Sequence, residues 1–366
     1  MEEKVITIPA VGLALSGGGA RAIAFGLGCM RALHDCDVLR HVRVVSGISG
    51  GSVLAAMWAY GPTNFAEFDA TVTGVLRRGF QLDLARRALS PLSMLKGAVG
   101  IVRAAPLMPG RRPRAFTRTE LLAQVLRDRV FGSLDLSQIE QPDLTAVISA
   151  TDLTSTNAVR FGSGVSSCAP FGRITDPVPV ADAVAASAAF PVLLPALVRR
   201  YEFQNSRGHR TDHVLAMTDG GVYDNLALLP LMPGRSAAHT SHVYELDHLI
   251  AVDSGRGRSL KGGATYFPTR MARSLDITFA KAQDSTRAQL HKAAEYGQLR
   301  GFVHSYLAMH DDNLPVPVAD LVARSDVIGY PTNFRAMSAV DLALLTARGE
   351  QLTRVLLAHY CPHLIS

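Results

Sequence analysis

Two strand, glycine-turn, helix units follow each other within the first sixty residues, and they limit the folds open to this chain. Residues 11–15 are apolar and end in the turn SGGG, after which apolar residues recur on a helical period from 23 to 33. The β-branched run 42–45 leads into a turn at 46–51 and a helix-like stretch at 52–60. Strands that alternate with helices pair in parallel. The sequence therefore predicts an α/β fold with helices packed on a parallel sheet.

The same kind of pattern continues along the chain. Buried strands are predicted at 144–150, 215–218 and 249–252, and helices at 120–127, 178–188, 271–296 and 338–359. Proline and glycine interrupt short apolar pieces between 86 and 118, which predicts a lid-like insertion at about 77–118. The predicted strands span most of the chain, so residues 1–366 are expected to form a single domain, and we find no internal repeat.

The N-terminus and the cysteines indicate the compartment and exclude several kinds of site. The start MEEKVITIPA has no basic, apolar and cleavage regions of a signal peptide, which predicts a cytoplasmic protein. The apolar stretches are too interrupted to span a bilayer. The four cysteines form no CxxC pair, and no EF-hand loop is present, so we expect free thiols, no metal and no cofactor.

The basic charge is concentrated in one segment. Residues 77–129 contain twelve Lys and Arg against three Asp and Glu, although the whole chain carries a formal charge of only +6. The aromatic residues of this segment are Phe80 and Phe116, fewer than base stacking in nucleic-acid binding requires. Aliphatic residues dominate instead, which predicts peripheral contact with an anionic membrane and no nucleic-acid partner. The candidate contacts are Arg111, Arg112 and Arg114.

The turn after the second predicted strand contains a candidate nucleophile. Residues 47–51 read Gly-Ile-Ser-Gly-Gly and match G-x-S-x-G between a strand and a helix, the context that the motif requires. A sharp turn there would hold Ser49 in a strained conformation with its hydroxyl exposed, while Gly47 and Gly51 would allow close packing of strand and helix. The helix N-terminus would stabilise negative charge that develops at the serine.

The first glycine turn allows two interpretations. The N–H groups of Gly17, Gly18 and Gly19 could form an oxyanion hole for acyl transfer. The same turn fits a dinucleotide-binding motif, which requires an acidic residue at the end of the second strand. That strand ends in Ser-Gly and continues into the Ser49 turn, which disfavours a dinucleotide. Arg21 would either secure the loop through backbone carbonyls or attract an anionic headgroup.

A third turn follows the predicted strand at 215–218. Asp219, Gly220 and Gly221 form a tight turn that lets the carboxylate point back over the edge of the sheet. Such a turn by itself is most often structural.

Together these turns resemble patatin-like phospholipases, in their order and in the position of the serine near the N-terminus. The stretch Ala186–Pro191 resembles the segment that precedes the aspartate in that family, whereas Ala22 departs from the usual glycine. The resemblance implies a three-layer α/β/α sandwich with a mostly parallel central sheet. It also implies hydrolysis of a lipid substrate by a Ser49–Asp219 dyad without histidine.

Other interpretations remain open. An α/β-hydrolase triad would need one of the eight histidines after Asp219, but none of them lies in a glycine-bounded turn after a strand. A non-catalytic protein that binds a lipid or a dinucleotide is a further alternative. An aspartate base requires a pKa raised by burial, because its reference value near 3.9 makes it a poor proton acceptor for serine. The sequence does not indicate the oligomeric state.

Overall fold

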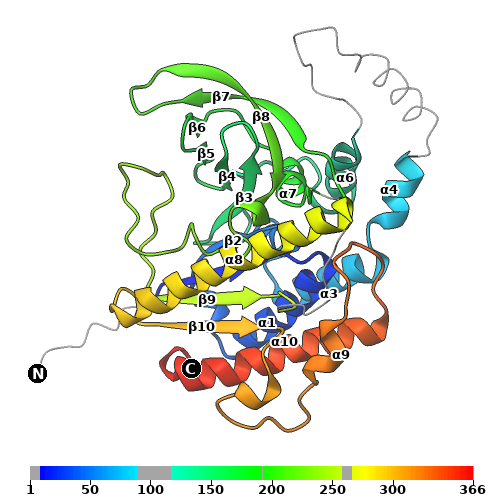
Figure 1. Cartoon of the computed structure of the whole chain (residues 1–366). Coiled ribbons are helices and arrows are strands. Elements are labelled where there is room, and N and C mark those ends of the chain that lie inside the picture. Colours follow the sequence, from blue (N-terminus) through cyan, green and yellow to red (C-terminus); the bar gives the residue numbers. More distant parts are fainter. Residues whose placement is uncertain (1–8, 89–116, 192, 258–265, 366) are drawn as a thin grey trace, which may run out of the picture.

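A computed structural model describes residues 9–88, 117–191, 193–257 and 266–365 (Figure 1). The strands are β1 (Val11–Leu15), β2 (Val42–Gly47), β3 (Thr145–Asp152), β4 (Asn157–Gly162), β5 (Ser167–Cys168), β6 (Gly172–Ile174), β7 (Leu197–Gln204), β8 (Arg210–Asp219), β9 (His248–Asp253) and β10 (Gly301–Tyr306). The helices are α1 (Ala20–Asp35), α2 (Gly50–Ala59), α3 (Phe65–Arg78), α4 (Gln81–Ala88), α6 (Arg118–Leu126), α7 (Val180–Ser187), α8 (Phe267–Glu295), α9 (Arg324–Ile328) and α10 (Ala339–Tyr360).

The strands form one sheet that closes partly on itself. Its order is β10-β9-β1-β2-β3-β4-β5-β6-β7-β8, and β3 also pairs with β8. The pairs from β10 to β3 are parallel, whereas every pair from β3 round to β8, including β3–β8, is antiparallel. The strands β3 to β8 therefore form a closed six-stranded antiparallel barrel, and the others extend it.

The predicted three-layer sandwich with a mostly parallel central sheet is therefore wrong. Parallel strands need a long crossover connection, usually a helix, as occurs between β1 and β2. Most connections between β3 and β8 are short turns, such as residues 205–209 between β7 and β8, and such turns join antiparallel neighbours.

Alternating apolar residues give the parallel strands two buried faces. Leu13, Leu15, Ile250 and Val252 belong to one core cluster, which also contains residues of α1, α2 and α10. Ala14, Leu249 and Ala251 belong to a second cluster with Leu290 and Ala293 of α8. The helix α8 thus lies on the face opposite α1 and α10, and the carboxyl ends of β1, β2 and β9 meet at one edge of the sheet (Figure 1).

The predicted basic insertion is described only at its two ends. Its start includes the end of α3 and all of α4, and α6 follows it, but residues 89–116 lie outside the described part. No helix within the described residues is long and apolar enough to cross a membrane.

Candidate active site

Ser49 lies in the sharp turn between β2 and α2. Its φ of 52° falls in the left-handed region, which L-residues rarely adopt. Its side chain is largely covered, and its carbonyl accepts the N–H of Ser52 at 3.0 Å. All residues of α2 are buried, so the helix that begins directly after the serine is fixed in the core. The backbone strain is maintained by this packing, which is a common property of functional turns.

Close packing explains the two glycines predicted to support this turn. A Cβ at Gly47 would lie 2.7 Å from Ser52 Cα, and one at Gly51 would collide with the carbonyl oxygen of Leu15. Any side chain at either position would push α2 away from the strand ends.

The first glycine turn lies against the Ser49 turn. Gly19 has a φ of 61° and precedes α1, and a Cβ at Gly50 would lie 2.8 Å from Gly19 N. The N–H of Gly17 donates to the Asn225 carbonyl at 3.1 Å, so it is not free to bind an oxyanion. Among the described residues, the N–H groups of Gly18 and Gly19 have no acceptor. Two of the three predicted donors are therefore available.

Arg21 secures this loop through backbone carbonyls. Its side chain is buried, and it donates from Nε to Ser254 O at 3.0 Å and from Nη1 to Tyr330 O at 2.8 Å. Burial, assisted by the positive charge of Arg256, lowers its pKa to about 10. These contacts fit the first of its two predicted roles, because the guanidinium joins the loop to segments that lie far away in the sequence.

Asp219 ends β8 at the same edge of the molecule. A Cβ at Gly220 would collide with the Ser149 carbonyl, and Gly221 donates its N–H to Asp219 Oδ1 at 2.7 Å. Burial raises the pKa of Asp219 to about 6, against the lowering effects of Gly221 and of the Ser49 hydroxyl. The Ser49 hydroxyl thus influences the carboxyl, yet Oδ2 is buried and has no hydrogen bond of standard geometry among the described groups.

The short segment 187–189 is hydrogen-bonded to both the Ser49 turn and the Asp219 turn. Ser187 Oγ accepts the backbone N–H of Ser49 at 3.0 Å and donates to the Ser149 carbonyl at 2.7 Å. Two residues later, the Ala189 carbonyl accepts the N–H of Asp219 at 3.0 Å. Ser187 and Ala189 fall in the stretch 186–191 noted in the sequence, but their contacts could not be predicted from it. The segment ties the serine and the aspartate to each other through their backbones.

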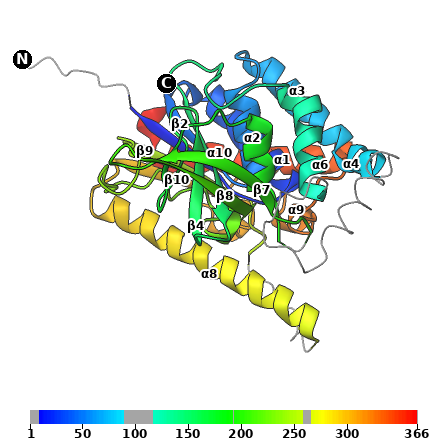
Figure 2. The same cartoon turned by 90° about the horizontal axis from the view of Figure 1, so that it is seen from above.

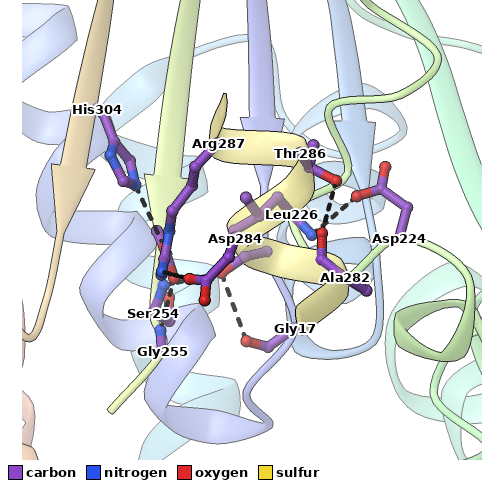
Figure 3. Close-up of polar contacts among 12 residues, drawn as sticks. Gly17, Asp224, Leu226, Ser254, Gly255, Ala282, Asp284, Thr286, Arg287 and His304 are labelled. Carbon is purple, nitrogen blue, oxygen red and sulfur yellow. Dashed lines mark hydrogen bonds and ion pairs between the residues drawn. The ribbon is translucent and has the colours of Figure 1, made fainter. Parts of the chain in front are cut away.

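A buried ion-pair cluster lies beside the glycine turn, and the sequence analysis missed it. Asp253 at the end of β9 accepts from Arg287 Nε at 3.1 Å and contacts His304 Nε2 at 3.2 Å. Figure 3 shows Arg287 and His304 pointing toward the chain beside Ser254. These cationic and hydrogen-bonding partners lower the pKa of Asp253 to about 2 in spite of its burial. The next residue, Ser254, donates its N–H to Ser16 Oγ at 2.8 Å. The cluster therefore braces the start of the glycine loop. The only signal in the sequence was an acidic residue after a buried strand.

The histidines are engaged elsewhere. His242 contacts Tyr244 Oη at 3.0 Å and Ser167 Oγ at 3.2 Å, and His248 pairs with His363 at 2.7 Å. Within the described part of the chain, no histidine forms a hydrogen bond with Ser49 or Asp219, which disfavours the triad. The described part of the chain also contains no group of three His, Cys, Asp or Glu side chains that could hold a metal ion.

Part of the basic segment is neutralised by neighbouring acids. Arg87 pairs with Asp128 at 2.6 Å, and Arg129 pairs with Asp83 at 2.7 Å. The membrane-contact candidates Arg111, Arg112 and Arg114 lie outside the described residues.

Comparison with known proteins identifies relatives of the chain. A family model described as "Patatin-like phospholipase" matches residues 13–232. Human GIVD cytosolic phospholipase A2 has a similar structure, with a TM-score of 0.55, 14% identity and coverage of 95% of this chain and 61% of its own. Its complex with methyl gamma-linolenyl fluorophosphonate gives a TM-score of 0.51, 14% identity, and coverage of 95% and 57%. This chain thus spans about three fifths of the length of that protein. No curated protein sequence matches it.

Proposed function

The chain belongs to the patatin-like phospholipase family, and we propose that it hydrolyses fatty-acyl esters of lipids through an acyl-serine intermediate. In this proposal Ser49 is the nucleophile, Asp219 is its base, and the N–H groups of Gly18 and Gly19 bind the oxyanion. The lipid hydrolase activity follows from the family, whereas the roles of the individual residues rest on the geometry described above.

The reaction proceeds in two steps, acylation of Ser49 and hydrolysis of the acyl-serine. Ser49 Oγ attacks the ester carbonyl carbon while its proton passes to Asp219 Oδ2, and the carbonyl oxygen becomes an oxyanion beside the glycine amides. The bond to the leaving alcohol breaks, and the proton returns from Asp219 to that oxygen. Water then attacks the acyl-serine with Asp219 as base, which releases the fatty acid and restores the Ser49 hydroxyl.

The observation that carries the proposal is the burial of the Asp219 carboxyl, which raises its pKa. A carboxylate with a pKa of about 6 accepts a proton more readily than an exposed aspartate, yet remains mostly ionised at neutral pH. Its buried Oδ2 has no competing donor of standard geometry among the described residues. The protein alone provides this burial, so no bound acyl chain is required to raise the pKa.

We further propose that the basic insertion at about 77–118 brings the enzyme to anionic membranes. Its excess positive charge and its aliphatic residues favour contact with lipid headgroups and acyl chains. The ion pairs of Arg87 and Arg129 reduce the charge available at its described ends. The arginines at 111, 112 and 114 therefore remain the main candidates for this contact.

Product analysis with point variants tests the proposal. The purified protein is incubated with phospholipid vesicles, and released fatty acids and lysolipids are identified by mass spectrometry. We expect Ser49→Ala and Asp219→Asn each to lower turnover by at least about 10³-fold, because a nucleophile and its base act as a unit.

The matched control is Ser46→Ala in β2. Like Asp219 Oδ2, Ser46 Oγ is buried and has no hydrogen-bond partner among the described groups. This control should keep full activity. Near wild-type turnover by either the Ser49 or the Asp219 variant would disprove the assignment. Binding of lipid without any product would favour the non-catalytic alternative.

A further inference from the structure

The two halves of α8 have different environments. Thr286, Leu290 and Ala293 in the C-terminal half are buried, and the latter two pack in the core cluster on one face of the sheet. The N-terminal half projects past the strands (Figure 2). There Met271 is 48% exposed, and Tyr266, which precedes the helix, is 79% exposed. About half of a long helix therefore presents apolar side chains that the described protein does not cover.

The projecting half combines exposed apolar side chains with an excess of basic residues. Besides Met271, Ile277 of this stretch is exposed, at 53%. Arg270 and Lys281 of the same stretch are exposed as well. Residues 266–281 include three basic residues and one acidic residue. Exposed apolar side chains together with an excess of basic residues fit an anionic lipid surface better than an acidic protein partner.

One residue of the same half of α8 contacts the segment beside the candidate active site. Phe279 stacks on Phe190, with ring centroids 6.1 Å apart. Phe190 directly follows Ala189, whose carbonyl holds the backbone of Asp219. Leu193, three residues further on, is 54% exposed. Through Phe279, the N-terminal half of α8 therefore contacts the segment that is bonded to the backbone of Asp219.

The buried half fixes the helix to the same site. Arg287 of α8 forms the ion pair with Asp253 that braces the start of the glycine loop. The guanidinium of Arg287 also lies 4.7 Å from the ring centroid of Tyr306, which adds a cation–π contact. A lipid surface bound to the exposed half would thus be held in a defined position relative to the catalytic edge.

We propose that the N-terminal half of α8, with Tyr266, Met271 and Ile277, is an interfacial surface that inserts into lipid next to the active site. This inference deepens the proposed function by naming the surface through which a membrane presents its acyl chains. It concerns a different part of the chain from the basic insertion, and it depends on apolar insertion more than on charge.

Tryptophan scanning tests the proposal directly. The only native tryptophan, Trp58, is buried and gives a constant background. Met271→Trp would place a second indole on the proposed surface. The matched control is Val340→Trp on α10, where the native side chain is 67% exposed. The helix α10 lies on the opposite face of the sheet from α8. Both variants are made in the Ser49→Ala background, so that vesicles remain intact and binding is measured without catalysis.

The vesicles contain three parts phosphatidylcholine, with bromine on the acyl chains, and one part phosphatidylserine. We expect the emission of Met271→Trp to shift to shorter wavelength and to be quenched by the brominated chains, whereas Val340→Trp changes little. In sedimentation, Met271→Glu should bind these vesicles roughly tenfold more weakly than Val340→Glu at both low and high salt. Unquenched Met271→Trp, or equal binding by the two Glu variants, would overturn the proposal.

These readouts separate the inference from the proposed function. A wild-type protein that binds through Met271 but releases no fatty acid would support the surface and disprove the hydrolase. A protein that hydrolyses vesicle lipids equally well with Met271→Glu would keep the hydrolase and disprove the surface. Hydrolysis of a short-chain soluble ester should be unchanged by Met271→Glu, because Met271 does not contact the reacting groups.

Discussion

Asp219 offers a quantitative prediction because its burial opposes its own ionisation. The folded-state pKa is raised from 3.8 to about 6. An aspartate with a raised folded pKa destabilises the fold at pH values above that pKa, and the penalty disappears once the group is protonated in both the folded and unfolded states. A rise of about two pKa units lowers the free energy of unfolding by about 3 kcal/mol at pH 8. At pH 4, less than about 1 kcal/mol of this destabilisation remains.

The change to test is Asp219→Asn, which removes the charge and keeps an oxygen for the Gly221 N–H. The free energy of unfolding of both proteins is measured by urea titration from pH 4 to pH 8. Relative to wild type, we expect the variant to gain about 2 kcal/mol of stability between those limits. The new amide also changes packing, but this effect does not depend on pH. The diagnostic quantity is therefore how the stability difference between variant and wild type changes with pH.

Asp253→Asn serves as the control with a different pH dependence. The pKa of Asp253 is lowered to about 2, so its stabilising contribution exists above the unfolded value and is lost only as pH falls toward 2. Its loss should cost at least about 2 kcal/mol, and this cost should be nearly constant from pH 4 to pH 8. A flat difference for Asp219→Asn over the same range would refute the claim that burial raises its pKa.

Three further predictions concern activity. Hydrolysis of a soluble ester, measured as kcat/KM, should fall about tenfold for each pH unit below about 6, because only ionised Asp219 accepts the serine proton; a flat profile down to pH 5 would exclude Asp219 as the base. Gly18→Ala should lower kcat by about 10²-fold or more, whereas Gly74→Ala in α3, where a Cβ meets nothing within 4 Å, should leave it unchanged. Changing Arg111, Arg112 and Arg114 together to Glu should weaken sedimentation with anionic vesicles at low salt but spare soluble-ester hydrolysis, and unchanged sedimentation would remove this segment from the membrane interface.

Local sequence signals predicted the turns of the site well. Each turn follows a short buried strand and depends on neighbouring glycines, as at Ser49 and Asp219, so spacing and composition were sufficient to select them. The family resemblance added the relation between these two residues, and the family model matches residues 13–232.

Features that depend on contacts between distant segments could not be predicted. The barrel closes through β3–β8 and includes β5 and β6, which have two and three residues and leave almost no periodic pattern. The bonds of Ser187 to Ser49 and of Arg287 to Asp253 join residues 138 and 34 positions apart. The engagement of Gly17 by Asn225 is equally non-local. Only the folded chain shows which glycine amides are free.

Covalent labelling of the nucleophile tests the central claim most directly. The native protein is treated with an alkyl fluorophosphonate, which phosphonylates activated serines, and the modified peptide is mapped by mass spectrometry. We predict one adduct per chain on Ser49, no adduct in Ser49→Ala, and labelling of Asp219→Asn slowed by at least about 10²-fold because the base is missing. An adduct on another serine, or labelling of Ser49 that does not depend on Asp219, would contradict the account.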